Sequence, residues 1–148
     1  MFWGSIGWNG QGVLRLVTET ISGKTYAQLL CDVIPATLER LNMHSAILIE
    51  VHATSHDTRL VINTKSSLNL RILEDYPSNS PDLNPVEHVW AYWKKRVHQR
   101  LPCNLEELEI YALEEWENIP LEFIHSCILS MPNRLAEIIK SHGGYTKY

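Results

Sequence analysis

The chain has 148 residues, 45% of them hydrophobic, so it can form one domain with a buried core. Its 13 Lys and Arg residues against 17 Asp and Glu give a net charge of −4, which argues against a dedicated, strongly binding nucleic-acid protein. There is no signal-peptide pattern and no apolar run near the roughly 20 residues of a membrane span. Three widely spaced cysteines exclude a complete set of internal disulfide bonds and give no zinc signature. We therefore expect a soluble, globular, intracellular protein without a membrane partner.

The N-terminal residues predict a hairpin followed by a helix. Residues 2–6 and 13–18 are expected to be strands, and residues 8–12 supply the turn between them. Apolar residues at helical spacing then predict a helix over residues 25–41. Pro35 lies inside that pattern and is expected to kink or break the helix, because proline lacks the backbone N–H donor.

The middle and C-terminal parts complete an α/β order of elements. The apolar run 46–51 predicts a strand buried on both faces, and a helical segment (58–68) and a short strand (70–73) follow it. From Pro85 onward the chain is expected to be helical. Its breaks are expected near Pro102, Pro120 and Pro132. This order predicts a single domain, residues 1–148, with helices covering a mixed sheet.

The most informative run is S-P-D-L-N-P-V-E-H-V-W, residues 80–90. It is a rigid turn that brings Glu87 to the first turn of a helix, at the edge of the apolar face. One interpretation is structural: Asn84 as N-cap, Pro85 at the first helical position and Glu87 two residues later would form a start similar to a capping box. The alternative is that Glu87 carries chemistry.

The run resembles the S-P-D-L-N-P-x-E signature of the Tc1/mariner family of transposases, whose glutamate is the last of three metal-binding carboxylates. Further motifs extend the resemblance over almost the whole chain. They are W-G and G-Q-G-V-L in residues 3–14, Y-x-x-L-L from Tyr26, the acidic helix with Leu108, Glu115 and Trp116, S-M-P-x-R at residues 130–134, and G-G-x-x-x-Y at residues 143–148.

The resemblance implies an RNase H-like fold, with a mixed sheet flanked by helices and a helical C-terminal region. It also implies metal-dependent DNA cleavage and strand transfer, the chemistry of DNA transposition. Two Mg²⁺ ions would be held by two aspartates and a glutamate, and Glu87 would be the catalytic, metal-binding glutamate of this chain.

The sequence departs from the family pattern at two points. Val51 stands where the second aspartate belongs, and a valine cannot bind a metal ion. Glu50 is a poor substitute, because neighbouring residues of a strand point to opposite faces. The first aspartate of the family lies on a strand before the W-G hairpin, where this chain begins. We therefore expect an incomplete sheet that lacks its first central strand. The hairpin should then pair directly with residues 46–51, or the fold should be marginally stable.

Several residues are candidates for contacts with DNA. Four basic residues follow Glu87 on the same predicted helix: Lys94, Lys95, Arg96 and Arg100. They form either a solvated helix face or a phosphate-binding surface. His56 matches the family's histidine beside the active site, whereas His52 is more simply a neutral, partly exposed residue. An acidic block between residues 106 and 122 contains no Lys or Arg and is expected to repel DNA.

The function expected from the resemblance is that of a truncated, inactive transposase domain. Its DNA binding would be weak and non-specific, and it would act in the nucleus. A non-catalytic interaction module, which binds a full-length transposase or a second copy of itself, is one alternative. A nuclease that uses Glu50 and Glu87 with a single metal ion is another.

Overall fold

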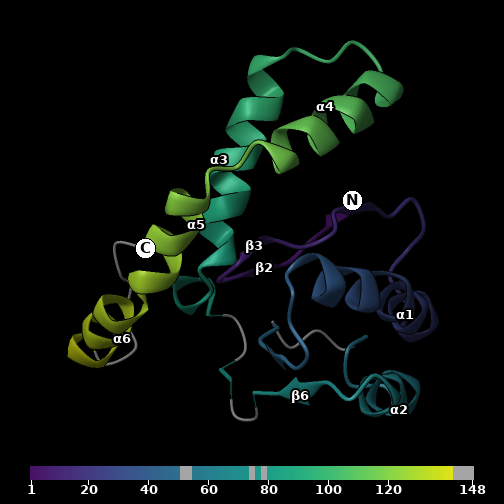
Figure 1. Cartoon of the computed structure of the whole chain (residues 1–148), viewed down its shortest axis with the longest axis vertical. Coiled ribbons are helices and arrows are strands. Elements are labelled where there is room, and N and C mark those ends of the chain that lie inside the picture. The colour runs from purple at the N-terminus through teal and green to yellow at the C-terminus, as the bar shows by residue number, and fades with distance from the viewer. Residues whose placement is uncertain (51–54, 74–75, 78–79, 142–148) are drawn as a thin grey trace. The chain divides into compact units, whose positions relative to one another are not determined.

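The computed structural model describes residues 1–50, 55–73, 76–77 and 80–141, which form two compact units (Figure 1). The first unit consists of Met1–Ser5 and Gly12–Ser80, and the second of Ile6–Gln11 and Pro81–Tyr148. Val51, His52 and the G-G-x-x-x-Y tail lie outside the described residues. No described helix is long and apolar enough to cross a membrane.

The base of the predicted hairpin belongs to the first unit. Strand β1 (Phe2–Trp3) pairs antiparallel with β4 (Arg15–Leu16), with Phe2 opposite Leu16. Gly12 lies against Ser5 and against Thr37 of helix α1 (Gly23–Arg40), because an added Cβ would be 2.5 Å from Ser5 Oγ and 2.7 Å from Thr37 Cγ2. Only a glycine fits this close approach without displacing its neighbours. The hairpin is confirmed, although its strands are shorter than predicted.

Helix α1 (Gly23–Arg40) provides the core of the first unit. It begins at Ser22, whose side chain accepts a hydrogen bond from the Thr25 N–H, and the predicted helix is confirmed. It is not broken at Pro35. Because Pro35 has no backbone N–H, the Cys31 carbonyl receives no hydrogen bond from the helix. Both residues are exposed, so water can donate to that carbonyl instead. The buried cluster around α1 consists of Val17, Tyr26, Ala27, Leu29, Leu30, Val33, Ile34 and Val61.

The predicted strand–helix–strand segment is confirmed in its order but not in its burial. Strand β5 (Ile47–Leu48) pairs in parallel with β6 (Arg71–Ile72), and helix α2 (Arg59–Ser67) connects them. The side chains of Ile47 and Ile49 are 51% and 44% exposed, so the prediction of a strand buried on both faces was wrong. The reason is that β5 has one strand neighbour, β6, among the described residues. The direct pairing with the hairpin is likewise not found in this part of the chain.

The second unit is mainly helical, as predicted. A short 3₁₀ turn (Pro81–Leu83) precedes four helices. These helices are α3 (Val86–Gln99), α4 (Leu105–Glu117), α5 (Leu121–Leu129) and α6 (Met131–Lys140). They are separated near the predicted prolines, and α5 and α6 meet at Ser130, two residues before Pro132.

Tryptophan rings form the centre of the second unit. Helices α3 and α4 pack side by side (Figure 1), with Trp93 donating a hydrogen bond of 2.8 Å to the Ala112 carbonyl. Trp90 stacks on the fully buried Trp116 with a centroid distance of 5.0 Å. The hairpin tip, strands β2 (Ile6–Gly7) and β3 (Gly10–Gln11), also belongs to this unit.

Candidate functional site

Glu87 lies in the first turn of helix α3, as the sequence predicted, and its side chain is exposed. The turn before it is held by backbone hydrogen bonds, from the Asn84 N–H to the Pro81 carbonyl (3.0 Å) and from the Glu87 N–H to the Asn84 carbonyl (3.2 Å). Asn84 Oδ1 accepts a further bond from the Val86 N–H at 3.2 Å. The N-cap residue of α3 is Pro85, which has no side-chain cap, so the prediction of Asn84 as N-cap and Pro85 at the first helical position was wrong by one residue. Asn84 instead fixes the turn just before the helix, and Glu87 is carried on that fixed backbone.

The capping role of Glu87 itself is wrong. A capping box would need the Glu87 carboxylate to accept from the Asn84 N–H, but that N–H already donates to Pro81. Within the described part of the chain, the Glu87 carboxylate has no hydrogen-bond partner or ion pair. It is an open carboxylate at a helix N-terminus, where the helix dipole favours negative charge.

Arg134 holds the turn that carries Glu87. The residue is 1% exposed, and its guanidinium donates to Ser130 Oγ (2.7 Å), to the Asp82 carbonyl (3.0 Å) and to His88 Nδ1 (2.8 Å). Burial, and then the nearby Arg134 charge, lower the pKa of His88, which keeps its ring neutral and able to accept this bond. Arg134 belongs to the S-M-P-x-R motif and Asp82 to the S-P-D-L-N-P motif, so the two motifs form one structural element.

Glu50, in the first unit, differs from Glu87 because both oxygens of its carboxylate are bound by other side chains. Its Oε2 accepts a hydrogen bond of 2.6 Å from the Tyr26 hydroxyl, and its Oε1 is bound by the Lys65 ammonium. His56 Nδ1 lies 3.8 Å from Oε2, and the His56 ring stacks on Tyr26 with a centroid distance of 4.0 Å. The Lys65 and Glu50 side chains are 9% and 10% exposed. Burial, and then the Glu50 charge, raise the pKa of Tyr26 well above its usual range.

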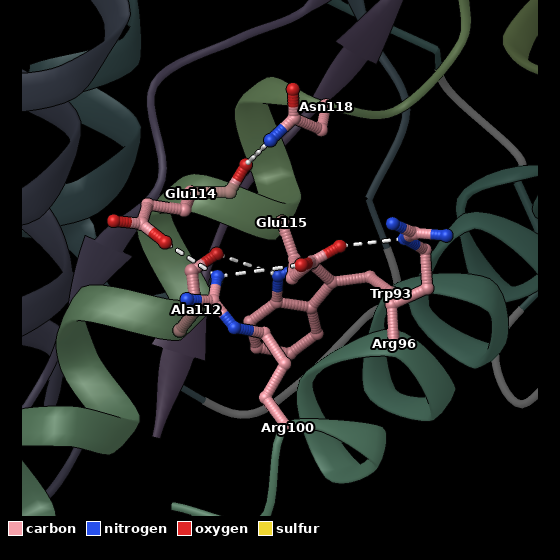
Figure 2. A network of polar contacts seen from close by, with 7 residues as sticks. All are labelled: Trp93, Arg96, Arg100, Ala112, Glu114, Glu115 and Asn118. Carbon is pink, nitrogen blue, oxygen red and sulfur yellow. Dashed lines mark hydrogen bonds and ion pairs between the residues drawn. The ribbon is translucent and has the colours of Figure 1, made fainter.

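Two of the four basic candidates are engaged with the acidic helix (Figure 2). Arg96 donates to Glu115 at 2.6 Å, and Arg100 donates to Glu114 at 2.5 Å and to Glu115 at 3.4 Å. The Arg100 guanidinium also lies 3.9 Å from the centroid of the Tyr111 ring. Part of the acidic block, Glu114 and Glu115, is therefore paired with the arginines of α3, which weakens the expected repulsion of DNA.

Lys94 and Lys95 are exposed on α3. They have no ion pair within the described residues, so they are the part of the basic run that is open to a phosphate. His56 is oriented toward Glu50 and stacked on Tyr26, which favours a supporting role over a DNA contact.

Sequence reasoning missed the partners of these residues. The sequence pattern placed Lys65 and Tyr26 on helices and Arg134 in a motif, but it did not predict which side chains they would contact. A lysine on an apolar helix face, such as Lys65 four residues after Val61, was the one available signal.

The described residues do not fit a two-ion metal site. No group of three or more His, Cys, Asp or Glu side chains among them could hold a metal ion. Glu87 could supply one oxygen ligand, but Glu50 is bound by an ammonium, and position 51 is a valine, which has no donor atom. The second unit therefore offers one open carboxylate, Glu87, and the first unit holds one carboxylate, Glu50, that the protein itself neutralises.

Comparisons with known proteins agree with this picture of the fold. The family model of the DDE superfamily endonucleases matches residues 4–109. The Tcb1 transposase of Caenorhabditis briggsae is 26% identical over 148 residues, which are 100% of this chain and 54% of that protein. The Tc1 transposase of Caenorhabditis elegans is 40% identical over 76 residues, 51% of this chain and 28% of that protein. The chain thus spans about half the length of the first of these relatives and less of the second.

Solved structures give the same fold. The catalytic domain of the Mos1 mariner transposase superposes with a TM-score of 0.81 at 24% identity, covering 95% of this chain and 72% of that one. The Mos1 paired-end complex with Mn gives a TM-score of 0.85 at 24% identity, covering 96% and 43%. The RNase H-like fold is confirmed, and so is the resemblance to Tc1/mariner transposases. The chain belongs to the DDE superfamily endonucleases, and among known proteins it is similar to transposases of the Tc1/mariner type.

Proposed function

We propose that this chain is a transposase domain that binds DNA weakly and does not cut it. The state of Glu50 carries the proposal. The family's chemistry needs carboxylates from three places, and here Val51 replaces one of them while its neighbour Glu50 is bound by Lys65. Without a carboxylate at position 51, two metal ions lack one of the ligands that would hold them against their mutual repulsion. The same engagement of Glu50 argues against a nuclease that uses Glu50 and Glu87 with a single ion.

The wider role follows from the relatives. Those reported above are named transposases, and the Mos1 structures include paired-end complexes with Mn and with Mg. We infer that the ancestral activity was DNA transposition with a divalent metal ion, by DNA cleavage and strand transfer. A domain with this fold and this function would meet its DNA in the nucleus.

A nicking assay tests the loss of cleavage. Supercoiled plasmid is incubated with the purified chain and Mg²⁺ or Mn²⁺, alongside a Glu87→Gln control. We expect the same background of nicked product with both proteins. Metal-dependent nicking that the wild-type chain shows and the Glu87→Gln chain does not would refute the proposal.

Lys94 and Lys95 are the proposed DNA contacts. Reversing both charges (Lys94→Glu, Lys95→Glu) should weaken binding to any duplex and lower the slope of log affinity against log salt by about 2, one unit for each lost phosphate contact. Fluorescence anisotropy with a labelled duplex between about 50 and 200 mM salt measures this slope. Arg96→Gln is the matched control, because Arg96 is already paired with Glu115 and its loss should change the slope less.

Self-association is a second candidate function. Helices α5 and α6 expose Leu129 (64%), Leu135 (47%) and Ile139 (73%), and the last two lie four residues apart on one face of α6. A second copy of the chain could cover this face. Light scattering over a range of concentrations should then show dimers that disappear in a Leu135→Glu, Ile139→Glu variant. A monomer at every concentration would exclude this function.

A further inference from the structure

The end of strand β5 contains a buried group of four polar side chains. Glu50 follows the strand, Tyr26 comes from α1, Lys65 comes from α2, and His56 precedes α2. Both oxygens of the Glu50 carboxylate are used, Oε1 by Lys65 and Oε2 by Tyr26. The Lys65 ammonium also lies 3.4 Å from the His56 carbonyl oxygen.

The charges in this group balance without any added ion. A buried carboxylate requires a positive partner, because an uncompensated charge in the interior is strongly unfavourable. Lys65 supplies one positive charge, and Tyr26 stays neutral because its pKa is raised by burial and by Glu50. A divalent cation at this carboxylate would meet the ammonium at close range and would find both carboxylate oxygens occupied.

We propose that Lys65 is a built-in cation, which occupies the Glu50 carboxylate in place of a divalent metal ion and excludes such an ion from it. Removing its charge exposes a carboxylate and a nearby imidazole, since His56 Nδ1 lies 3.8 Å from Glu50 Oε2. Carboxylate and imidazole together are ligands for Mn²⁺ and Zn²⁺. The Lys65→Met chain therefore acquires a metal site that the wild-type chain lacks.

This inference concerns the same region as the proposed function but is tested by metal binding, not by DNA cleavage, so each can fail alone. Mn²⁺ binding is measured from the paramagnetic broadening of backbone amide signals in wild-type chain and in the Lys65→Met variant. In the wild-type chain, we expect no selective broadening at residues 47–50 and 56–65. In Lys65→Met, these signals should broaden, and the melting temperature should rise by several degrees as Mn²⁺ saturates the site.

Two further variants control for folding and charge. The double variant Lys65→Met, Glu50→Gln removes both charges. It therefore leaves no unpaired charge in the interior, and it should be folded and insensitive to Mn²⁺. Lys65→Arg keeps the positive charge and should also exclude Mn²⁺. Selective broadening around Glu50 in the wild-type chain would overturn the proposal. So would a folded Lys65→Met chain that gains no Mn²⁺ binding, because the ammonium would then not be what keeps the metal out. If Lys65→Met does not fold, Lys65→Gln replaces it in the same comparison.

Discussion

Glu50 and Glu87 are two glutamates with opposite environments. Glu50 ends an apolar strand run, Glu87 belongs to the S-P-D-L-N-P-x-E run, and both were considered as metal ligands. Glu50 is about nine-tenths buried and bound on both oxygens, whereas Glu87 is exposed and has no partner within the described residues. In the first case the side chain is fixed and its charge is balanced. In the second the backbone is fixed, through Arg134, and the charge is left open.

The two glutamates are positioned in different ways, one through its carboxylate and the other through the backbone around it. Lys65 and Tyr26 bind the Glu50 carboxylate itself, which removes it from any chemistry. Arg134 binds the Asp82 carbonyl and the His88 ring, on either side of Glu87, and leaves the carboxylate accessible. Only the second arrangement suits a residue that has to meet a ligand from outside the protein.

The largest effect should come from breaking the Glu50 pair. Glu50→Gln leaves the Lys65 ammonium buried without a counter-charge, so the free energy of unfolding should fall by about 3 kcal/mol. Urea denaturation measures this change. Glu39→Gln, on the exposed side of α1, is the matched control and should have little effect. Equal stability of the two variants would mean that Glu50 is not the partner of a buried charge.

Arg134→Met tests the other arrangement. Ser130 Oγ, the Asp82 carbonyl and His88 Nδ1 each lose a donor in a partly buried place, so we expect the free energy of unfolding to fall by about 2 kcal/mol in total. Amide hydrogen exchange should accelerate first at Asn84, Val86 and Glu87, ahead of the rest of the unit.

Arg96→Met is the control for Arg134→Met. Arg96 is another arginine of the second unit that donates to a side chain, here the Glu115 carboxylate, but its own side chain is 43% exposed, and exposed ion pairs contribute little to stability. If Arg134→Met raised exchange uniformly over the unit, its role would be general packing and not the positioning of Glu87.

Local patterns predicted the elements of this fold well. The helix start near Pro85, the hairpin and the α2 segment all depend on residues close in sequence, so the sequence pattern was sufficient to predict them. The burial of residues 46–51 was mispredicted because it depends on strands elsewhere in the sheet. An apolar run indicates that a strand can be buried, not that neighbours bury it.

The site was less predictable for the same reason. Tyr26 and Lys65 reach Glu50 from 24 and 15 residues away, and Arg134 reaches Asp82 from 52 residues away. Such pairings are set by tertiary packing, which the local pattern of a single sequence does not reveal. The resemblance located Glu87, but the state of its carboxylate required the structure.

A smaller effect is expected from pH, through His88. Its folded-state pKa is lowered below the ordinary value of 6.5, so the folded protein binds fewer protons than the unfolded chain when this group titrates. Its contribution to stability is fully present above the ordinary pKa of about 6.5, and it is lost as the pH falls from there through the lower pKa of the folded state. His88→Asn, which keeps an acceptor for Arg134 but does not titrate, should flatten this part of the pH dependence. If stability depended on pH in the same way for the wild-type chain and His88→Asn, neither burial nor the Arg134 contact would be lowering the pKa of His88.

The smallest effect should come from Glu87→Gln, the same substitution as at Glu50. An exposed carboxylate without partners loses only its favourable interaction with the N-terminus of α3, about 0.5 kcal/mol, and less at high salt. Urea denaturation at low and high salt separates this dipole effect from a lost hydrogen bond, which salt would not screen. A loss above about 2 kcal/mol would mean that Glu87 is held in the way Glu50 is, and that the signature glutamate is a structural residue. A loss near the smaller value would leave the carboxylate open at little cost to stability, as expected of a side chain kept for a ligand.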